Sequence, residues 1–228
     1  MDFSQVHITN IADHRVQSLT PTVDTFVAPS GSNLPSLIST PKTYAALRYH
    51  QIKRRLQDLF VMAIYRITNR ADGIKINFRA TKPIATALHQ NMYTAFAEKD
   101  LSTLKRICCS GLYDSFVSRI SARPKGETWT WELVKMTKSP KVMSNRAASL
   151  GIDRAGIRQA VVRICSQQRL TRYKLDGSVV PGTGEVKEVK EYIVIQKTLW
   201  QGVESEWMVW GTTEETTIEK VREAQAAI

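Results

Sequence analysis

The sequence is poor in cysteine, and its three cysteines form no recognisable binding pattern. Cys108, Cys109 and Cys165 are an odd number, include no CxxC pair and lie among apolar residues. Disulfide frameworks and zinc sites need paired or regularly spaced cysteines. We therefore expect a reducing compartment, and we expect Cys108 and Cys109 to pack as small hydrophobic side chains.

Long hydrophobic runs and ligand-binding motifs are also missing. The longest apolar run, 59–65, ends at Arg66 and falls well short of the roughly 18 residues that span a bilayer. The four histidines lie far apart, at His7, His14, His50 and His89. Gly182 and Gly184 lie between predicted strands, so they indicate a turn and not a phosphate loop. We expect no metal, no cofactor and no small-molecule substrate.

Basic residues are scarce in the first forty positions. Residues 1–40 hold one basic residue, Arg15, and three prolines. They lack the Arg-rich character of a mitochondrial presequence and show no sustained hydrophobic period. The sequence predicts an extended arm over residues 1–41 and a single folded domain over 42–228.

Positive charge is in excess and is concentrated in the middle of the chain. The net charge is +11. Residues 81–170 hold fifteen basic and six acidic side chains, against ten and five before them and seven and ten after them. Such an excess favours polyanionic partners, either nucleic-acid phosphates or acidic lipid head groups.

Helical periodicity dominates the first half of the domain. Apolar residues recur at helical spacing over about 42–69, interleaved with basic residues, which predicts a long basic amphipathic helix. A second helix is predicted from Pro83, and a third after a cap at Asp100 or Ser102. A fourth is predicted to end before Pro124.

After Gly126 the period changes to two. Strands are predicted over 129–136, 156–171, 186–200 and 207–211. In the second of these, the predicted buried face holds Ala160, Val162 and Ile164, and the predicted solvent face holds Gln159, Arg163, Gln167 and Arg169. Helices followed by an antiparallel meander predict an α+β domain with the helices packed on the sheet.

Three segments resemble a known mitochondrial domain. They are Phe96 to Asp100, Trp129 to Trp131 and the ending Trp207 to Thr216, with its sequence WMVWGTTEET. The resemblance covers about 44–220 and includes two groups. One is the mitoribosomal group of the fungal Mba-type ribosome receptor and metazoan large-subunit protein forty-five. The other is the C-terminal domain of the import-motor membrane adaptor.

The resemblance implies a fold, a function and a location. The fold is a cone like that of nuclear transport factor two, with helices against a curved antiparallel sheet. The function is that of a non-enzymatic protein of the mitochondrial large ribosomal subunit. It would act as an inner-membrane ribosome receptor near the polypeptide exit tunnel and support membrane insertion of mitochondrially made proteins. The location is the matrix side of the inner membrane, held peripherally.

The implied partners are the large-subunit rRNA and ribosomal proteins, acidic lipid of the inner membrane, and a membrane insertase. The alternative is an import-motor adaptor of the presequence translocase. That adaptor carries a longer charged N-terminal region than the short arm seen here, so the ribosomal group is favoured.

Basic residues between positions 119 and 169 are the predicted RNA-binding set, because the acids among them are few. The set is Arg119, Arg123, Lys125, Lys135, Lys138, Lys141, Arg146, Arg154, Arg158, Arg163 and Arg169. Lys53, Arg54 and Arg55 on the first helix are predicted to meet either membrane lipid or RNA.

Two other interpretations compete with docking. Some cone folds are enzymes that place an acid and a tyrosine in an apolar pocket. The acids of the predicted strands, Glu188, Glu191, Glu204 and Glu206, are instead expected on solvated surfaces or at strand ends. The five tryptophans could stack on RNA bases, although most are expected in the core.

Overall fold

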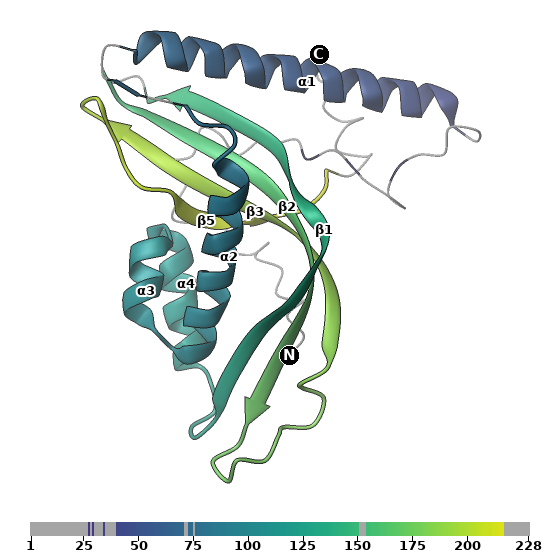
Figure 1. The fold of residues 1–228 in the computed structure, drawn as a ribbon, viewed down its shortest axis with the longest axis vertical. Helices are drawn as coiled ribbons and strands as arrows, with labels where there is room; N and C mark the ends of the chain where they lie inside the picture. The colour runs from purple at the N-terminus through teal and green to yellow at the C-terminus, as the bar shows by residue number, and fades with distance from the viewer. Residues whose placement is uncertain are drawn as a thin grey trace.

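The computed structural model confirms an α+β fold in which helices cover a curved antiparallel sheet. It describes residues 27, 29, 34, 40–70, 73–74, 76–150 and 154–216. These residues form four helices and five strands. Helices α2, α3 and α4 lie together on one side of the sheet, and α1 lies across one end of it (Figure 1). Most of the predicted arm lies outside the described residues.

The four helices are close to those predicted. They are α1 (Pro41–Thr68), α2 (Thr81–Glu98), α3 (Leu101–Ile107) and α4 (Ser110–Ser121). Proline fits the first turn of α1 because its missing N–H has no helical partner there. Asp100 caps α3, since its carboxylate accepts a hydrogen bond of 3.0 Å from the backbone N–H of Thr103.

The strands form one antiparallel sheet. They are β1 (Thr128–Ser149), β2 (Gly156–Tyr173), β3 (Val186–Trp200), β4 (Val203–Glu204) and β5 (Met208–Thr213). The order is β1-β2-β3, and both β4 and β5 pair with β3. Strand β1 is therefore an edge strand. It continues well beyond the predicted end at residue 136, because several register shifts let it follow β2 through a polar segment containing Pro140.

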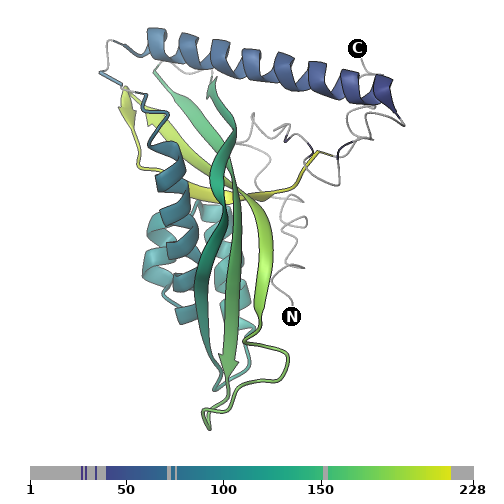
Figure 2. The same cartoon turned by 45° about the vertical axis from the view of Figure 1, so that its right-hand side comes forward.

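The main core lies between helices α2–α4 and the face of the sheet that they cover, called here the helical face. Ala160, Val162 and Ile164 of β2 are completely buried there against Phe96 and Phe116. This confirms the buried face predicted for β2. The views in Figures 1 and 2 agree that the three helices share this side.

The opposite side of the sheet, called here the outer face, is not fully open to solvent. Val161 of β2 is completely buried on it, together with Val27 of the N-terminal region and with Tyr192 and Val194 of β3. The solvated second face predicted for β2 is thus wrong around Val161, because a distant part of the chain covers it.

Helix α1 packs through one side on β1 and on the end of the β3–β4 hairpin. Met62 and Tyr65 are buried against Ala147 and Leu199. Gly156 lies beneath the ring of Tyr65, and a Cβ atom there would lie 3.0 Å from the backbone oxygen of Ala148. Glycine at this position therefore allows close approach of the helix and the two strands.

Candidate functional site

Register shifts in β1 gather three lysines on the outer face. Lys135, Lys138 and Lys141 are three residues apart, a spacing that would alternate faces in a regular strand. In the observed register they pair with Gln167, Cys165 and Arg163, which are alternate residues of β2. Residues directly opposite in an antiparallel pair share a face. The three lysines therefore lie in a line along β1, with Arg163 beside Lys141 on β2, and these four residues are called here the basic row.

The basic row is accessible. All three lysines are exposed and Arg163 is partly exposed. Within the described part of the chain none of the three lysines makes an ion pair. Arg169 continues along the same face, where its guanidinium lies 3.2 Å from Glu132. Of the predicted RNA-binding set, these five residues are the ones that the structure brings together.

Two members of that set are buried, which corrects the prediction that they face a phosphate. Arg123 is 8% exposed, lies over the rings of Phe96 and Trp129, and donates hydrogen bonds to backbone oxygens. Burial, followed by the charges of Arg119 and Arg172, lowers the pKa of Arg123 to about 10. Its role is to join the end of α2 to the sheet.

Arg158 is 3% exposed and lies on the helical face, over the rings of Trp207 and Phe78. Burial lowers the pKa of this guanidinium, and the nearby Glu204 and Tyr65 oppose that effect. The alternation of β2 could have revealed this, because Arg158 has the same parity as the buried Ala160.

The other predicted residues are dispersed. Arg119 lies over Phe96 and Phe116, and burial lowers the pKa of Arg119. Arg146 is paired with Asp58 of α1 at 2.5 Å. Lys125 and Arg154 are exposed in connecting segments. On α1, Lys53 and Arg55 are exposed, whereas Arg54 is partly buried.

A polar network is buried between α2 and the sheet. Glu191 of β3 accepts a hydrogen bond from Gln168 at 2.8 Å and contacts Nε2 of His89 at 2.7 Å. The hydroxyl of Tyr93 donates to its other oxygen. Trp131 stacks on Tyr93 and donates to Gln168 at 3.1 Å. The prediction that Glu191 is solvated is therefore wrong, because residue 191 shares the helical face with Ile193 and Ile195.

The network holds Glu191 as a carboxylate. Burial by itself would raise the pKa of Glu191, but the contact with His89 and the hydrogen bonds from Tyr93 and Gln168 hold this pKa below its usual value. Burial and the Glu191 charge raise the pKa of Tyr93 far above its usual value. Among the described residues, Nδ1 of His89 has no hydrogen-bond partner. The arrangement is a charge held by fixed donors inside the core.

Glu204 lies at a strand end, as expected, but it is only partly exposed. It accepts a hydrogen bond of 2.9 Å from the hydroxyl of Tyr65 and lies 3.5 Å from Lys197. Glu188 and Glu206 are exposed, as expected. Glu204 therefore helps to attach α1 to the sheet.

Four tryptophans pack as expected and one does not. Trp129 and Trp207 pack against the main core, Trp210 packs against the outer-face cluster and Trp131 belongs to the polar network. Trp200 is 55% exposed. The packing of Cys108 is confirmed, because it is buried, and burial together with Cys109 raises the pKa of its thiol to about 12.

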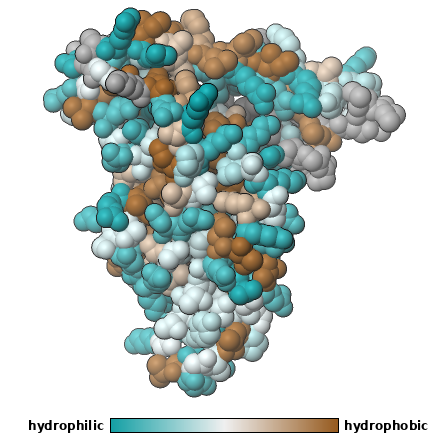
Figure 3. All heavy atoms as spheres, viewed as in Figure 1, coloured by the Kyte–Doolittle hydropathy of each residue, from teal (hydrophilic) through white to brown (hydrophobic). Residues whose placement is uncertain are grey.

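Helix α1 exposes a wide apolar surface that sequence reasoning did not assign. Tyr49, Ile52, Leu56, Leu59, Phe60 and Ile67 are each between 59% and 73% exposed. Figure 3 shows hydrophobic side chains among hydrophilic ones along the end of the molecule that α1 forms. A signal was present in the sequence, since apolar residues occupy more of this helix than one packing face requires.

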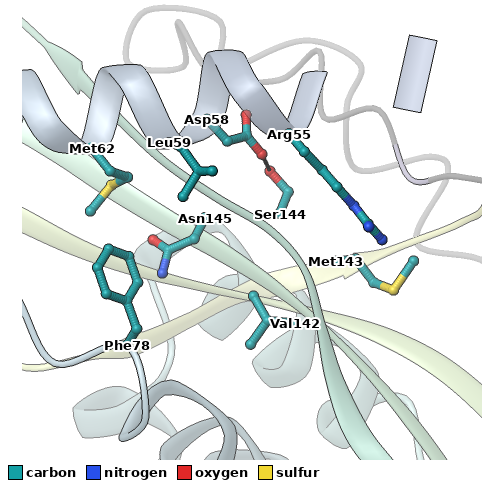
Figure 4. A pocket seen from close by; sticks show the side chains of 9 residues that line it. All are labelled: Arg55, Asp58, Leu59, Met62, Phe78, Val142, Met143, Ser144 and Asn145. Carbon is teal, nitrogen blue, oxygen red and sulfur yellow. Dashed lines mark hydrogen bonds between the residues drawn. The ribbon is translucent and has the colours of Figure 1, made fainter. Parts of the chain in front are cut away.

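A groove of about 340 Å³ opens between α1 and β1. Leu59, Met62 and Phe78 line its apolar part, and Asp58 hydrogen-bonds to Ser144 at 2.7 Å in its polar part (Figure 4). Arg55 extends along the groove from α1. The groove therefore lies beside the exposed surface of α1.

The described residues contain neither a membrane-spanning helix nor a cluster of metal-binding side chains. No helix among them combines the length and hydropathy of a membrane span. No group of His, Cys, Asp and Glu side chains in the described ranges could hold a metal ion.

Comparisons with known proteins agree with the sequence resemblance. The family described as "MBA1-like protein" matches residues 7–227. The inner membrane mitoribosome receptor MBA1 of Saccharomyces cerevisiae is 25% identical over 132 residues, which is 58% of this chain and 46% of the yeast protein. The chain thus matches about half of that relative's length. Among solved structures, the intermembrane space region of chloroplast protein ARC6 covers 61% of this chain and 97% of its own, with 10% identity and a TM-score of 0.39.

Proposed function

The chain belongs to the MBA1-like protein family, and from this membership we propose that it is a non-enzymatic receptor that holds mitochondrial ribosomes at the inner membrane. It would bind the large subunit near the polypeptide exit tunnel, from the matrix side. Nascent chains would thereby leave the ribosome close to a membrane insertase. Family membership favours this branch over the import-motor adaptor.

The basic row is the observation that supports ribosome binding most directly. Its four residues share one face, with three lysines along β1 and Arg163 beside Lys141 on β2, and Arg169 lies farther along β2. Side chains of this kind contact phosphates, which position a protein on RNA without reading its sequence. Ribosomal RNA is the polyanion that this surface would meet, and neighbouring ribosomal proteins would contact the rest of the docked surface.

A second explanation of the same lysines is structural. β1 is a long edge strand, and lysines on edge strands prevent pairing with other chains. Glutamate would serve that purpose equally well. Only RNA binding requires the positive sign, so charge reversal separates the two explanations.

We predict that the triple variant Lys135→Glu, Lys138→Glu, Lys141→Glu loses about tenfold or more of its affinity for purified large mitochondrial ribosomal subunits. Co-sedimentation over a range of salt concentrations measures this. The slope of log affinity against log salt should fall by about two to three if each lysine contacts a phosphate.

The matched control is Lys82→Glu, Lys105→Glu, Lys174→Glu, which changes the net charge equally at exposed positions on other elements. The control should bind nearly as wild type does. If both variants bind as wild type does, the basic row does not contact the ribosome. Co-purification of the wild type with the import channel and not with ribosomes would support the adaptor function.

A further inference from the structure

Most exposed apolar side chains of α1 form one continuous surface directed away from the sheet, and Leu59, at the edge of this surface, also lines the groove beside β1. Six of these residues are called here the apolar stripe, and their successive spacings are three, four, three, one and seven residues: Tyr49, Ile52, Leu56, Leu59, Phe60 and Ile67. At about 100° of rotation per residue they share one side of the helix. The buried residues Leu47, Met62 and Tyr65 lie on the opposite side.

Cations border this stripe and acids do not. By the same rotation, Arg48, Arg55 and Arg66 lie along one edge of the stripe, and Lys53 lies on the other. Asp58 is the single acid in the sequence of α1. It faces inward, where it binds Ser144 and Arg146. The outward side of the helix therefore combines apolar groups with positive charge and carries no acid.

We propose that α1 lies in the head-group region of an anionic phospholipid bilayer, with its apolar stripe inserted among the upper parts of the acyl chains. This inference rests on the membrane-facing part of the proposed function and supplies its contact surface. An apolar face bordered by Lys and Arg is the arrangement of helices that lie in a membrane interface. The long apolar arms of Arg and Lys let their charged ends reach the phosphates.

The placement of α1 suits a planar surface. The helix lies across one end of the sheet, with its packed side toward the strands (Figures 1 and 2). Its 28 residues correspond to a length of about 42 Å, and the stripe runs along most of it. The side chains of β1 that α1 contacts, Ser144, Arg146 and Ala147, follow Lys141 along the strand. The two surfaces therefore occupy successive parts of β1.

Charge argues against a second copy of the chain on the same stripe. Self-association through α1 would bring together two helices that each carry six basic residues and one acidic residue. Like charges at close range oppose such contact. Anionic head groups neutralise the same cations. Each Lys or Arg near such a surface strengthens membrane binding.

The test is flotation of the full chain with two kinds of vesicle, phosphatidylcholine alone and phosphatidylcholine with cardiolipin. The variant Ile52→Gln, Leu56→Gln, Phe60→Gln keeps every charge and replaces exposed residues by a good helix former. We expect wild type to float with the anionic vesicles, and this variant to lose about tenfold or more of that partitioning. The control Leu175→Gln, Val179→Gln, Val203→Gln removes three exposed apolar side chains elsewhere and should float as wild type does.

A second variant, Lys53→Gln, Arg55→Gln, should also bind anionic vesicles less than wild type does. Unchanged flotation of the Ile52, Leu56, Phe60 variant would mean that charge alone holds the protein, and would overturn insertion. Equal flotation of wild type with both vesicles would overturn the anionic requirement.

Two further measurements test whether the apolar stripe binds a ribosome or a second copy of the chain in place of lipid. If the apolar variant floats normally but fails to co-sediment with large ribosomal subunits, the stripe is a ribosome contact. If wild type is a dimer without lipid and the variant a monomer, the stripe is a contact between copies. Ribosome binding by the basic row is assayed without lipid, so it can fail or succeed independently of flotation.

Discussion

The carboxylate of Glu191 is mostly buried on the helical face and is held by donors from two elements. His89 and Tyr93 reach it from α2, and Gln168 reaches it from β2. An ionised group in the core is tolerated only when such partners replace water. The network therefore constrains how α2 packs on the sheet.

Replacing Glu191 by Gln should lower the free energy of unfolding by about 3 kcal/mol at neutral pH, because the donors lose their charged partner. The folded-state pKa of Glu191 lies below its usual 4.5, so its contribution is present above about pH 4.5 and is lost as the pH falls through the folded value. Melting curves of wild type and variant should therefore differ most at neutral pH and converge on acidification. An equal difference at all pH values would mean that the charge of Glu191 contributes nothing.

At the scale of single elements, α1 is attached along one side only. Its anchors are Met62 and Tyr65 in the apolar contact, Asp58 in the ion pair with Arg146, and the hydrogen bond from Tyr65 to Glu204. Elements with few buried contacts open before the rest of a domain does. We expect α1 to be less stable than α2, which is embedded in the main core.

Asp58→Ala should weaken this attachment by about 2 kcal/mol, because Ser144 and Arg146 lose a mostly buried carboxylate partner. Hydrogen exchange followed by mass spectrometry should show faster exchange in α1 with no change in α2. The control Asp114→Ala removes an exposed acid from α4 and should leave α1 exchange unchanged. Faster exchange of α1 and α2 together would show that α1 does not open independently.

At the scale of the whole molecule, the N-terminal region contributes to the fold. Val27 is completely buried against Val161, Tyr192 and Val194. Its N–H donates to the hydroxyl of Thr216 at 3.0 Å, and its carbonyl accepts from the N–H of Thr216 at 2.8 Å. Segments from both ends of the described chain thus meet on the outer face.

Val27→Ala should lower the free energy of unfolding by about 2 kcal/mol, since two methyl groups leave a buried cluster. Urea denaturation measures the change. Val203→Ala, at a position that is 72% exposed, should cost less than about 0.5 kcal/mol. Equal stability of both variants would mean that the N-terminal segment does not stabilise the domain.

The sequence by itself determined the kinds and order of the elements. Periods of 3.6 and 2 depend on neighbouring residues, so α1 to α4 and the strands β2, β3 and β5 could be predicted close to their true positions. The capping role of Asp100 and the buried face of Ala160, Val162 and Ile164 are local in the same way. The motifs ending at Trp207 to Thr216 identified the family.

Only the tertiary structure decided where the lysines of β1, Arg123 and Glu191 lie. The register shifts of β1 arise from its pairing with β2, and they place Lys135, Lys138 and Lys141 together although their spacing does not. Arg123 is buried and Glu191 is mostly buried because distant aromatic and polar groups surround them. The apolar stripe of α1 is exposed because the sheet covers the other side of the helix. A sequence period shows that one face of an element is apolar. Which residues pack on that face depends on segments that are distant in the sequence and meet only in the folded protein.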